Sequence, residues 1–106
     1  GYRDAELQAV ARLDQAVAGL REAGDRVAAL RAAVDQWTEV VRTEALALDQ
    51  GAGTQNDYLR AEADLALSRA SLAQAQGTEL IRQVELALVL GDLSLESLPT
   101  MVESVP

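Results

Sequence analysis

The residues whose types could bind a ligand lie in one short stretch, Gly51-Ala52-Gly53-Thr54, with Asp49 before it and Asp57 after it. The stretch lacks the third glycine of a dinucleotide-binding fingerprint, and it lacks the lysine of a phosphate-binding loop. It follows a predicted helix, whereas a dinucleotide-binding turn follows a strand. The two aspartates do not continue into the alternating acidic positions of a calcium loop. The stretch therefore predicts no phosphate, nucleotide or calcium site.

The rest of the sequence is equally poor in reactive groups. It contains no Cys and no His, so we expect no disulfide, no thiolate chemistry and none of the commonest metal ligands or general bases. The net charge of −8 argues against a nucleic-acid partner, which requires a positive surface. We expect no enzymatic activity, no catalytic residue, no cofactor and no bound metal.

The elements that carry the Gly51 stretch are predicted to be two long helices. Residues 4–50 contain no Pro, and their apolar residues recur at steps of three and four, close to a heptad repeat. The predicted contact row of the first helix consists of Val10, Leu13, Val17, Leu20, Gly24, Val27, Leu30, Val34, Trp37 and Val41. Gly51 is a natural end for this helix, because glycine adopts the left-handed conformation found just past helix ends.

A second helix is predicted over residues 55–90. Thr54 with Asp57 three residues later fits the capping pattern of a helix start, with Thr54 as N-cap and Asp57 at the positive end of the helix dipole. One row has a seven-residue spacing and contains Tyr58, Leu65, Leu72, Glu79 and Leu86; a neighbouring row contains Leu80, Val84 and Leu88. A lone hairpin buries one row only, so we expect the second row to contact another chain.

The predicted fold class is all-α, a long antiparallel coiled-coil hairpin. The hairpin occupies residues 1–93, and its tip, residues 51–54, lies far from both termini because the connection is too short for any other arrangement. Gly91 is predicted to end the second helix, Ser94 to cap a single turn through Leu98, and residues 94–106 to form an irregular tail with Pro99 and Pro106 as helix breakers. No apolar run is long enough to span a bilayer. The chain begins at Gly1, and we expect it to be a fragment or a processed form.

Around the tip, the sequence "LDQGAGTQNDYLRA" resembles the periplasmic hairpin tip of TolC-like outer-membrane efflux proteins. That family's repeat reads roughly Y-x-x-G-x-x-[TS]-x-x-D-V-L-x-A. Gly51, Thr54, Asp57, Leu59 and Ala61 occupy the corresponding positions, and downstream leucines and alanines lead to Leu90-Gly91-Asp92-Leu93, similar to the family's closing A-L-G-x-L. The resemblance covers residues 45–93. Leu48, Gln55-Asn56 and Tyr58 depart from the pattern, and Gly53 and Arg60 stand where some members carry charged gate residues.

The resemblance implies a fold and a function. Members of the family are homotrimers of the Gram-negative outer membrane, and their hairpins form an α-helical tunnel through the periplasm. The tips form the tunnel entrance and dock the periplasmic adaptor (membrane fusion) protein, which connects them indirectly to an inner-membrane pump. By this resemblance the chain is a passive conduit from the C-terminal half of such a protein. Gly51, Gly53, Thr54 and Asp57 are the expected adaptor contacts, and three copies of Asp57 would form an acidic ring at the entrance.

Two other interpretations of the hairpin's function stay open. The α-hairpin of a periplasmic adaptor protein has a tip that resembles R-x-x-x-L followed seven residues later by Ser. Arg42 and Leu46 fit that pattern, but Gly53 stands at the Ser position, with Thr54 one residue late. A generic structural coiled coil explains the apolar rows and the caps, but it does not explain the ordered match that begins at Gly51.

Overall fold

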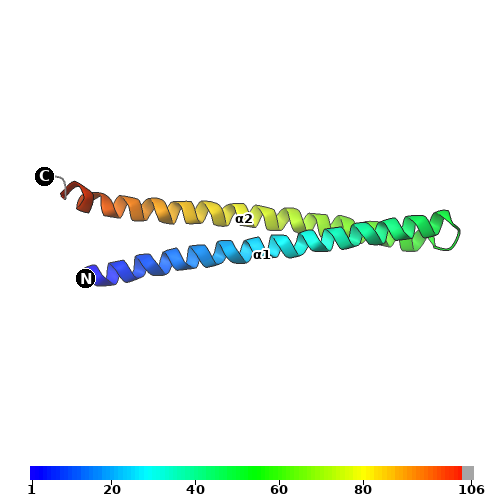
Figure 1. Cartoon of the computed structure of the whole chain (residues 1–106), viewed down its shortest axis with the longest axis horizontal. Helices are drawn as coiled ribbons and strands as arrows, with labels where there is room; N and C mark the ends of the chain where they lie inside the picture. Colours follow the sequence, from blue (N-terminus) through cyan, green and yellow to red (C-terminus); the bar gives the residue numbers. More distant parts are fainter. Residues whose placement is uncertain (104–106) are drawn as a thin grey trace.

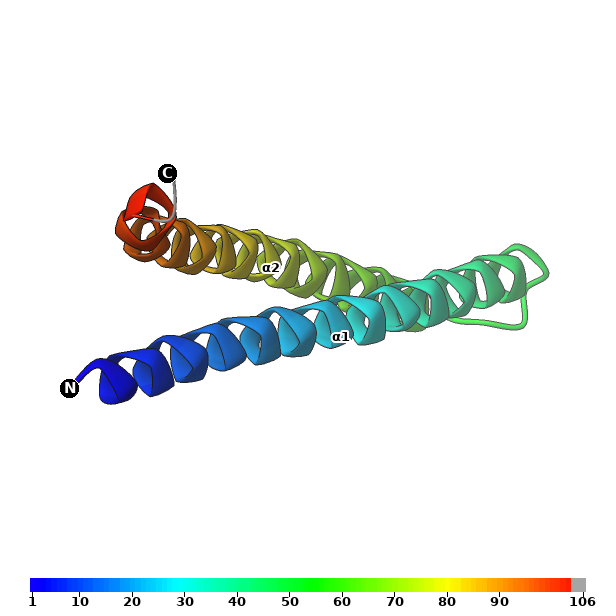
Figure 2. The ribbon, with the colours of Figure 1, turned by 60° about the vertical axis from the view of Figure 1, so that its left-hand side comes forward.

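The chain forms two long helices joined by a tight reversal. The computed structural model describes residues 1–103, with side chains described for residues 1–95. Helix α1 spans Tyr2–Asp49 and helix α2 spans Gln55–Glu103. The helices run antiparallel, lie side by side near the tip and diverge toward the termini (Figure 1 and Figure 2). The molecule measures 82 × 24 × 13 Å, and the all-α hairpin predicted from the sequence is confirmed.

The contact between the helices is a narrow row of small residues. Among the described side chains, the buried apolar ones are Ala9, Ala23, Val27, Ala61, Leu65 and Ala75. Four of these six are alanines, and no large side chain there is fully buried. Small side chains let two helix backbones approach closely, but they remove little apolar surface from water. The hairpin therefore has no thick core. We call the row of buried and half-buried residues between α1 and α2 the seam.

The α1 side of the seam differs from the predicted row near the N-terminus. Val27 is buried, and Leu13, Leu20, Leu30, Val34, Trp37 and Val41 are half-buried, as predicted. The prediction is wrong for Val10 and Val17, which are 55% and 38% exposed. Ala9 and Ala23 are buried in the same region. The buried side chains there are therefore alanines, and the valines lie outside the seam.

The α2 side of the seam follows the predicted seven-residue row. Leu65 is buried, and Tyr58, Leu72, Glu79 and Leu86 are half-buried. Glu79 fits because its carboxylate lies over Gly24, where an added Cβ would be 3.2 Å from Glu79 Oε2. Arg82 lies across Gly19 in a similar way, with its Cδ 3.5 Å from the place of an added Cβ. Two glycines of α1 thus leave room for long polar side chains of α2.

Helix α2 continues well beyond its predicted end. A stop at Gly91 and an extended tail from residue 94 were expected, but the helix runs to Glu103, so the prediction is wrong up to that residue. Ser94 accordingly lies within the helix and does not cap a new turn. A glycine ends a helix when it adopts a positive φ, and among the described residues only Gly51 does so. Residues 104–106, including Pro106, lie outside the described residues.

No stretch of either helix within residues 1–103 combines the length and the hydropathy that a bilayer crossing requires.

Candidate docking site at the hairpin tip

Helix α1 ends in a Schellman motif centred on Gly51. Gly51 has φ +75°, the left-handed conformation that glycine adopts at little steric cost. Its N–H donates to the Leu48 carbonyl at 3.1 Å, and the Ala52 N–H donates to the Ala47 carbonyl at 2.8 Å. These are the two backbone bonds that define this helix end. The predicted helix stop at Gly51 is confirmed, and the turn satisfies carbonyls that would otherwise lack a partner.

Gly53 packs tightly against the end of α1. Its N–H also donates to the Ala47 carbonyl, at 3.0 Å. A Cβ added to Gly53 would lie 3.0 Å from Ala47 Cβ and 3.2 Å from the Leu48 backbone nitrogen. The second of these is a backbone atom that cannot rotate away. Gly53 is therefore needed for the shape of the tip itself, a role that the sequence pattern did not predict.

Thr54 and Asp57 begin helix α2 as the sequence predicts. The Asp57 N–H donates to Thr54 Oγ1 at 3.1 Å, and the Tyr58 N–H donates to the Thr54 carbonyl at 3.2 Å. Thr54 is thus the N-cap and Asp57 is the third residue of the helix. Both residues are exposed. The Asp57 carboxylate is available to another molecule while it also lies near the positive end of the α2 dipole.

A shallow hollow lies beside the tip. It is lined by Ala45, Leu48, Asp49 and Tyr58 and has a volume of about 440 Å³. Tyr58 is half-buried, so it both contacts the seam and lines the hollow. A hydrogen bond to Glu62, together with that residue's negative charge, raises the pKa of Tyr58 above 10.0. The hollow joins residues from two helices, and sequence spacing within either helix does not reveal it.

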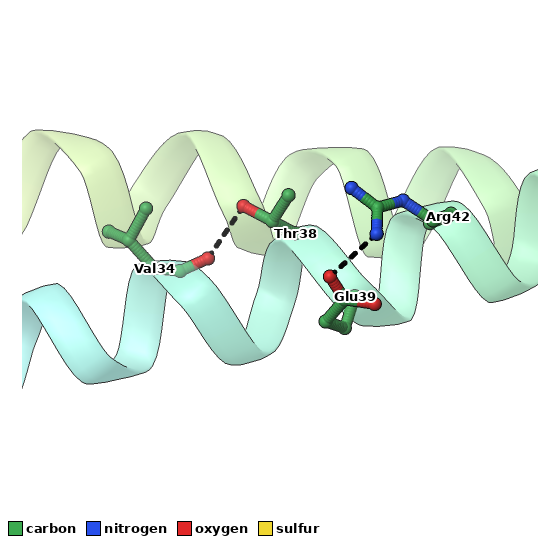
Figure 3. A network of polar contacts seen from close by, with 4 residues as sticks. All are labelled: Val34, Thr38, Glu39 and Arg42. Atoms are coloured by element: carbon green, nitrogen blue, oxygen red, sulfur yellow. Dashed lines mark hydrogen bonds and ion pairs between the residues drawn. The ribbon is translucent and has the colours of Figure 1, made fainter.

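The last turns of α1 present further exposed groups. Leu46 is 57% exposed. One turn earlier, the Arg42 guanidinium donates to Glu39 Oε1 at 2.9 Å, and both side chains are largely in solvent (Figure 3). Thr38 donates its hydroxyl to the Val34 carbonyl at 2.7 Å on the same helix (Figure 3). Exposed ion pairs of this kind contribute little stability, so Arg42 is free to exchange Glu39 for another partner.

The predicted contact residues lie close together at the tip. The four predicted contact residues, Gly51, Gly53, Thr54 and Asp57, lie within one turn and the first turn of α2. No group of three or more potential metal-ligating side chains occurs in the described part of the chain. The arrangement presents backbone, one hydroxyl and one carboxylate, which suit contact with another protein. Comparison of the whole chain with family models, with characterised proteins and with solved structures finds no match.

Proposed function

We propose that this chain is the periplasmic tunnel-forming hairpin of an outer-membrane efflux or type I secretion channel. In this proposal the hairpin is a passive conduit, and it docks a periplasmic adaptor protein through its tip. The observation that carries the proposal is the tip itself. Gly51, Thr54 and Asp57, three of the residues on which the family resemblance rests, are the ones that end α1 and begin α2 at the far end of an 82 Å rod.

The geometry of the tip divides the proposed contact residues by role. Gly51, Thr54 and Asp57 are exposed and available to an adaptor, whereas Gly53 is half-buried against α1 and holds the turn. A docking partner would meet backbone at Gly51, the Thr54 methyl and hydroxyl, and the Asp57 carboxylate. In a homotrimer of the full-length protein, three copies of Asp57 at the entrance would attract cations. The inner-membrane pump would be reached only through the adaptor.

The adaptor-hairpin alternative is supported by the exposure of Arg42 and Leu46. These two residues carry the resemblance to an adaptor tip, and both lie exposed, one turn apart on α1. In that case the chain would dock onto an outer-membrane channel, and the channel would be its partner. A generic coiled coil would use neither surface.

The proposal is tested by site-specific crosslinking. The 106 residues contain no cysteine, so an introduced cysteine is the only thiol in this segment. Ala52→Cys places a thiol at the exposed tip, and Gln76→Cys places one on the exposed shaft of α2. Each variant of the full-length protein is treated, in cells that contain its adaptor, with a short bifunctional thiol–amine crosslinker. We expect an adaptor adduct from Ala52→Cys and none from Gln76→Cys.

Equal adducts from both positions, or none from the tip, would refute tip docking. An adduct from Ala52→Cys to an outer-membrane channel protein, with no adduct to an adaptor, would establish the adaptor-hairpin alternative. Trimer formation, measured in the same samples, shows that the variants are assembled.

A further inference from the structure

The hollow beside the tip combines an apolar wall, a carboxylate and an aromatic ring. Ala45 and Leu48 form the wall, the Asp49 carboxylate lies at the end of α1, and Tyr58 contributes its ring from α2. The hollow measures about 440 Å³, whereas a water molecule occupies only about 30 Å³. A hard metal ion needs several oxygen ligands and would find one carboxylate there. The lining fits a larger ligand that is partly apolar and carries a positive charge.

Asp49 is an acidic group that the described part of the chain leaves without a counterion. Within residues 1–95 its carboxylate takes part in no hydrogen bond or ion pair. It is the last residue of α1, and the last turn of that helix has no basic residue. A carboxylate is unfavourable there, because the negative end of the helix dipole lies at the C-terminus. The positive end of the α2 dipole, at the same tip, already has Thr54 and Asp57 beside it.

The charged groups on the same side of the hairpin as the hollow do not neutralise Asp49. Arg42, two turns before Asp49, donates to Glu39, which lies still farther from the tip. Glu62, one turn after Tyr58, accepts the hydrogen bond of the Tyr58 hydroxyl and adds a second negative charge. A cation in the hollow would therefore meet carboxylates and no competing basic side chain.

The remaining basic residue near the tip, Arg60, lies on the far side of α2. It follows Tyr58 by two residues, which is about 200° around the helix, and Asp64 lies one turn after it on that far side. Residues 39–64 hold two basic side chains, Arg42 and Arg60, against six acidic ones. The acidic ones are Glu39, Glu44, Asp49, Asp57, Glu62 and Asp64. This end of the hairpin is negative, and its charge favours a cationic partner surface.

We propose that the hollow binds a lysine or arginine side chain of the adaptor protein that docks at the tip. The methylene groups of that side chain lie on Ala45 and Leu48, and its charged end lies between the Asp49 carboxylate and the Tyr58 ring. Lysine and arginine commonly bury their stems along an apolar surface in this way. The carboxylate supplies a charge-assisted hydrogen bond, and the ring attracts the cation through its face. An acidic side chain would be repelled by Asp49, and an apolar one would cover the carboxylate without pairing it.

The inference rests on tip docking in the proposed function, and it adds Asp49 and Tyr58 to the predicted contacts. Because the hollow lies beside the tip, a trimer with its three tips at one entrance presents three hollows at that same end. The Asp57 carboxylate belongs to the next position around α2 and remains available for the acidic ring.

Binding of small cationic probes to the 106-residue chain tests the chemistry of the hollow without any adaptor. The probes are N-acetyl-arginine methylamide and N-acetyl-lysine methylamide, and N-acetyl-norleucine methylamide is the uncharged control. Amide chemical shifts are recorded by NMR at constant ionic strength. We expect both cationic probes, and not the norleucine compound, to give saturable shifts at the four lining residues at millimolar concentration.

Asp49→Asn and Asp35→Asn are the matched variants for this titration. Both remove one aspartate charge from an exposed position of α1, and Asp35 lies fourteen residues farther from the tip. We expect Asp49→Asn to weaken probe binding about fivefold or more and Asp35→Asn to change it by less than about twofold. Circular dichroism checks that both variants remain helical. No saturable shift with either cationic probe, equal binding of the norleucine compound, or equal effects of the two variants would overturn the proposal.

The crosslinking assay then tests whether the adaptor is the occupant. In the full-length protein, Asp49→Asn is combined with Ala52→Cys, and Asp35→Asn is the control combination. We expect Asp49→Asn to lower the yield of the adaptor adduct about fivefold or more, with trimer formation unchanged, and Asp35→Asn to leave the yield unchanged. A normal adduct that is insensitive to Asp49→Asn would overturn this inference alone. No adduct from Ala52→Cys itself would refute tip docking, and the adaptor as occupant with it.

Discussion

The contact between Gly53 and the end of α1 leads to a stability prediction that runs against the usual effect of replacing glycine. In Gly53→Ala the new Cβ would lie 3.0 Å from Ala47 Cβ and 3.2 Å from the Leu48 nitrogen, so the turn must open. Opening the turn also weakens the 3.0 Å bond from the Gly53 N–H to the Ala47 carbonyl. Overpacking costs about 1–3 kcal/mol and a lost hydrogen bond about 0.5–1.5 kcal/mol. We expect a net destabilisation of about 2 kcal/mol.

Gly19→Ala is the matched control for Gly53→Ala. At Gly19 an added Cβ would be 3.5 Å from the flexible Arg82 Cδ, an ordinary contact, within a regular helix. There the better helix propensity of alanine should stabilise the chain by about 0.5–1 kcal/mol. Tm is measured by thermal unfolding followed by circular dichroism at one protein concentration. We expect Tm to be lower than that of the parent for Gly53→Ala and higher for Gly19→Ala. Each kcal/mol corresponds to about 4–8 °C. If Gly53→Ala melts at or above the parent, the packing argument at the tip is refuted.

Three further predictions concern the start of α2. Thr54→Ala removes the acceptor of the Asp57 N–H and should lower the free energy of unfolding, measured by chemical denaturation, by about 1 kcal/mol. Thr54→Ser keeps a hydroxyl acceptor and should keep most of that stability; equal stability of the two variants would contradict the role of Thr54 as N-cap. Under the proposed channel function, Asp57→Asn in the reconstituted full-length protein should reduce cation selectivity in single-channel recordings, while Asp92→Asn, far from the tip, should not; unchanged selectivity would refute the proposed acidic ring. Tyr58 should titrate above 10.0 by ultraviolet difference absorbance, and Glu62→Gln should lower its pKa. Because the folded-state pKa is raised, this interaction stabilises the fold below about pH 10 and is lost as the pH rises through the Tyr58 pKa; an unchanged titration in Glu62→Gln would contradict the assignment.

The features predicted correctly from sequence are those set by neighbours in the chain. The Gly51 stop and the Thr54 cap each depend on a few consecutive residues, and backbone sterics and one hydroxyl determine them. The seven-residue row of Tyr58, Leu65 and Leu72 was also predicted, because its regular spacing places these large residues on one side of α2.

The N-terminal half of the α1 seam could not be predicted in the same way. Val10 and Val17 compete there with Ala9 and Ala16, one residue away, and apolar character alone favours the valines. The outcome depends on what α2 presents. At Gly19 and Gly24, for example, α2 presents the long side chains of Arg82 and Glu79, which the sequence of α1 does not specify.

The end of α2 shows a second limit. Gly91 and Pro99 are common helix breakers, and the local signal predicted a stop, yet the helix continues to Glu103. Glycine permits the left-handed conformation but does not impose it, so a stop follows only where the chain must turn, as it does at Gly51.

The sequence alone determined that this protein is a two-helix hairpin, where it reverses and which residues cap the reversal, because these features depend on local periodicity and short-range sterics. Only the tertiary structure decided which apolar row meets α1 and which stays exposed, that Gly53 is held by Ala47 and Leu48, and that Tyr58 lines a hollow with residues of α1. These features depend on the distance and rotation between two helices. That geometry is set by all the side chains of the seam together, and no segment specifies it alone.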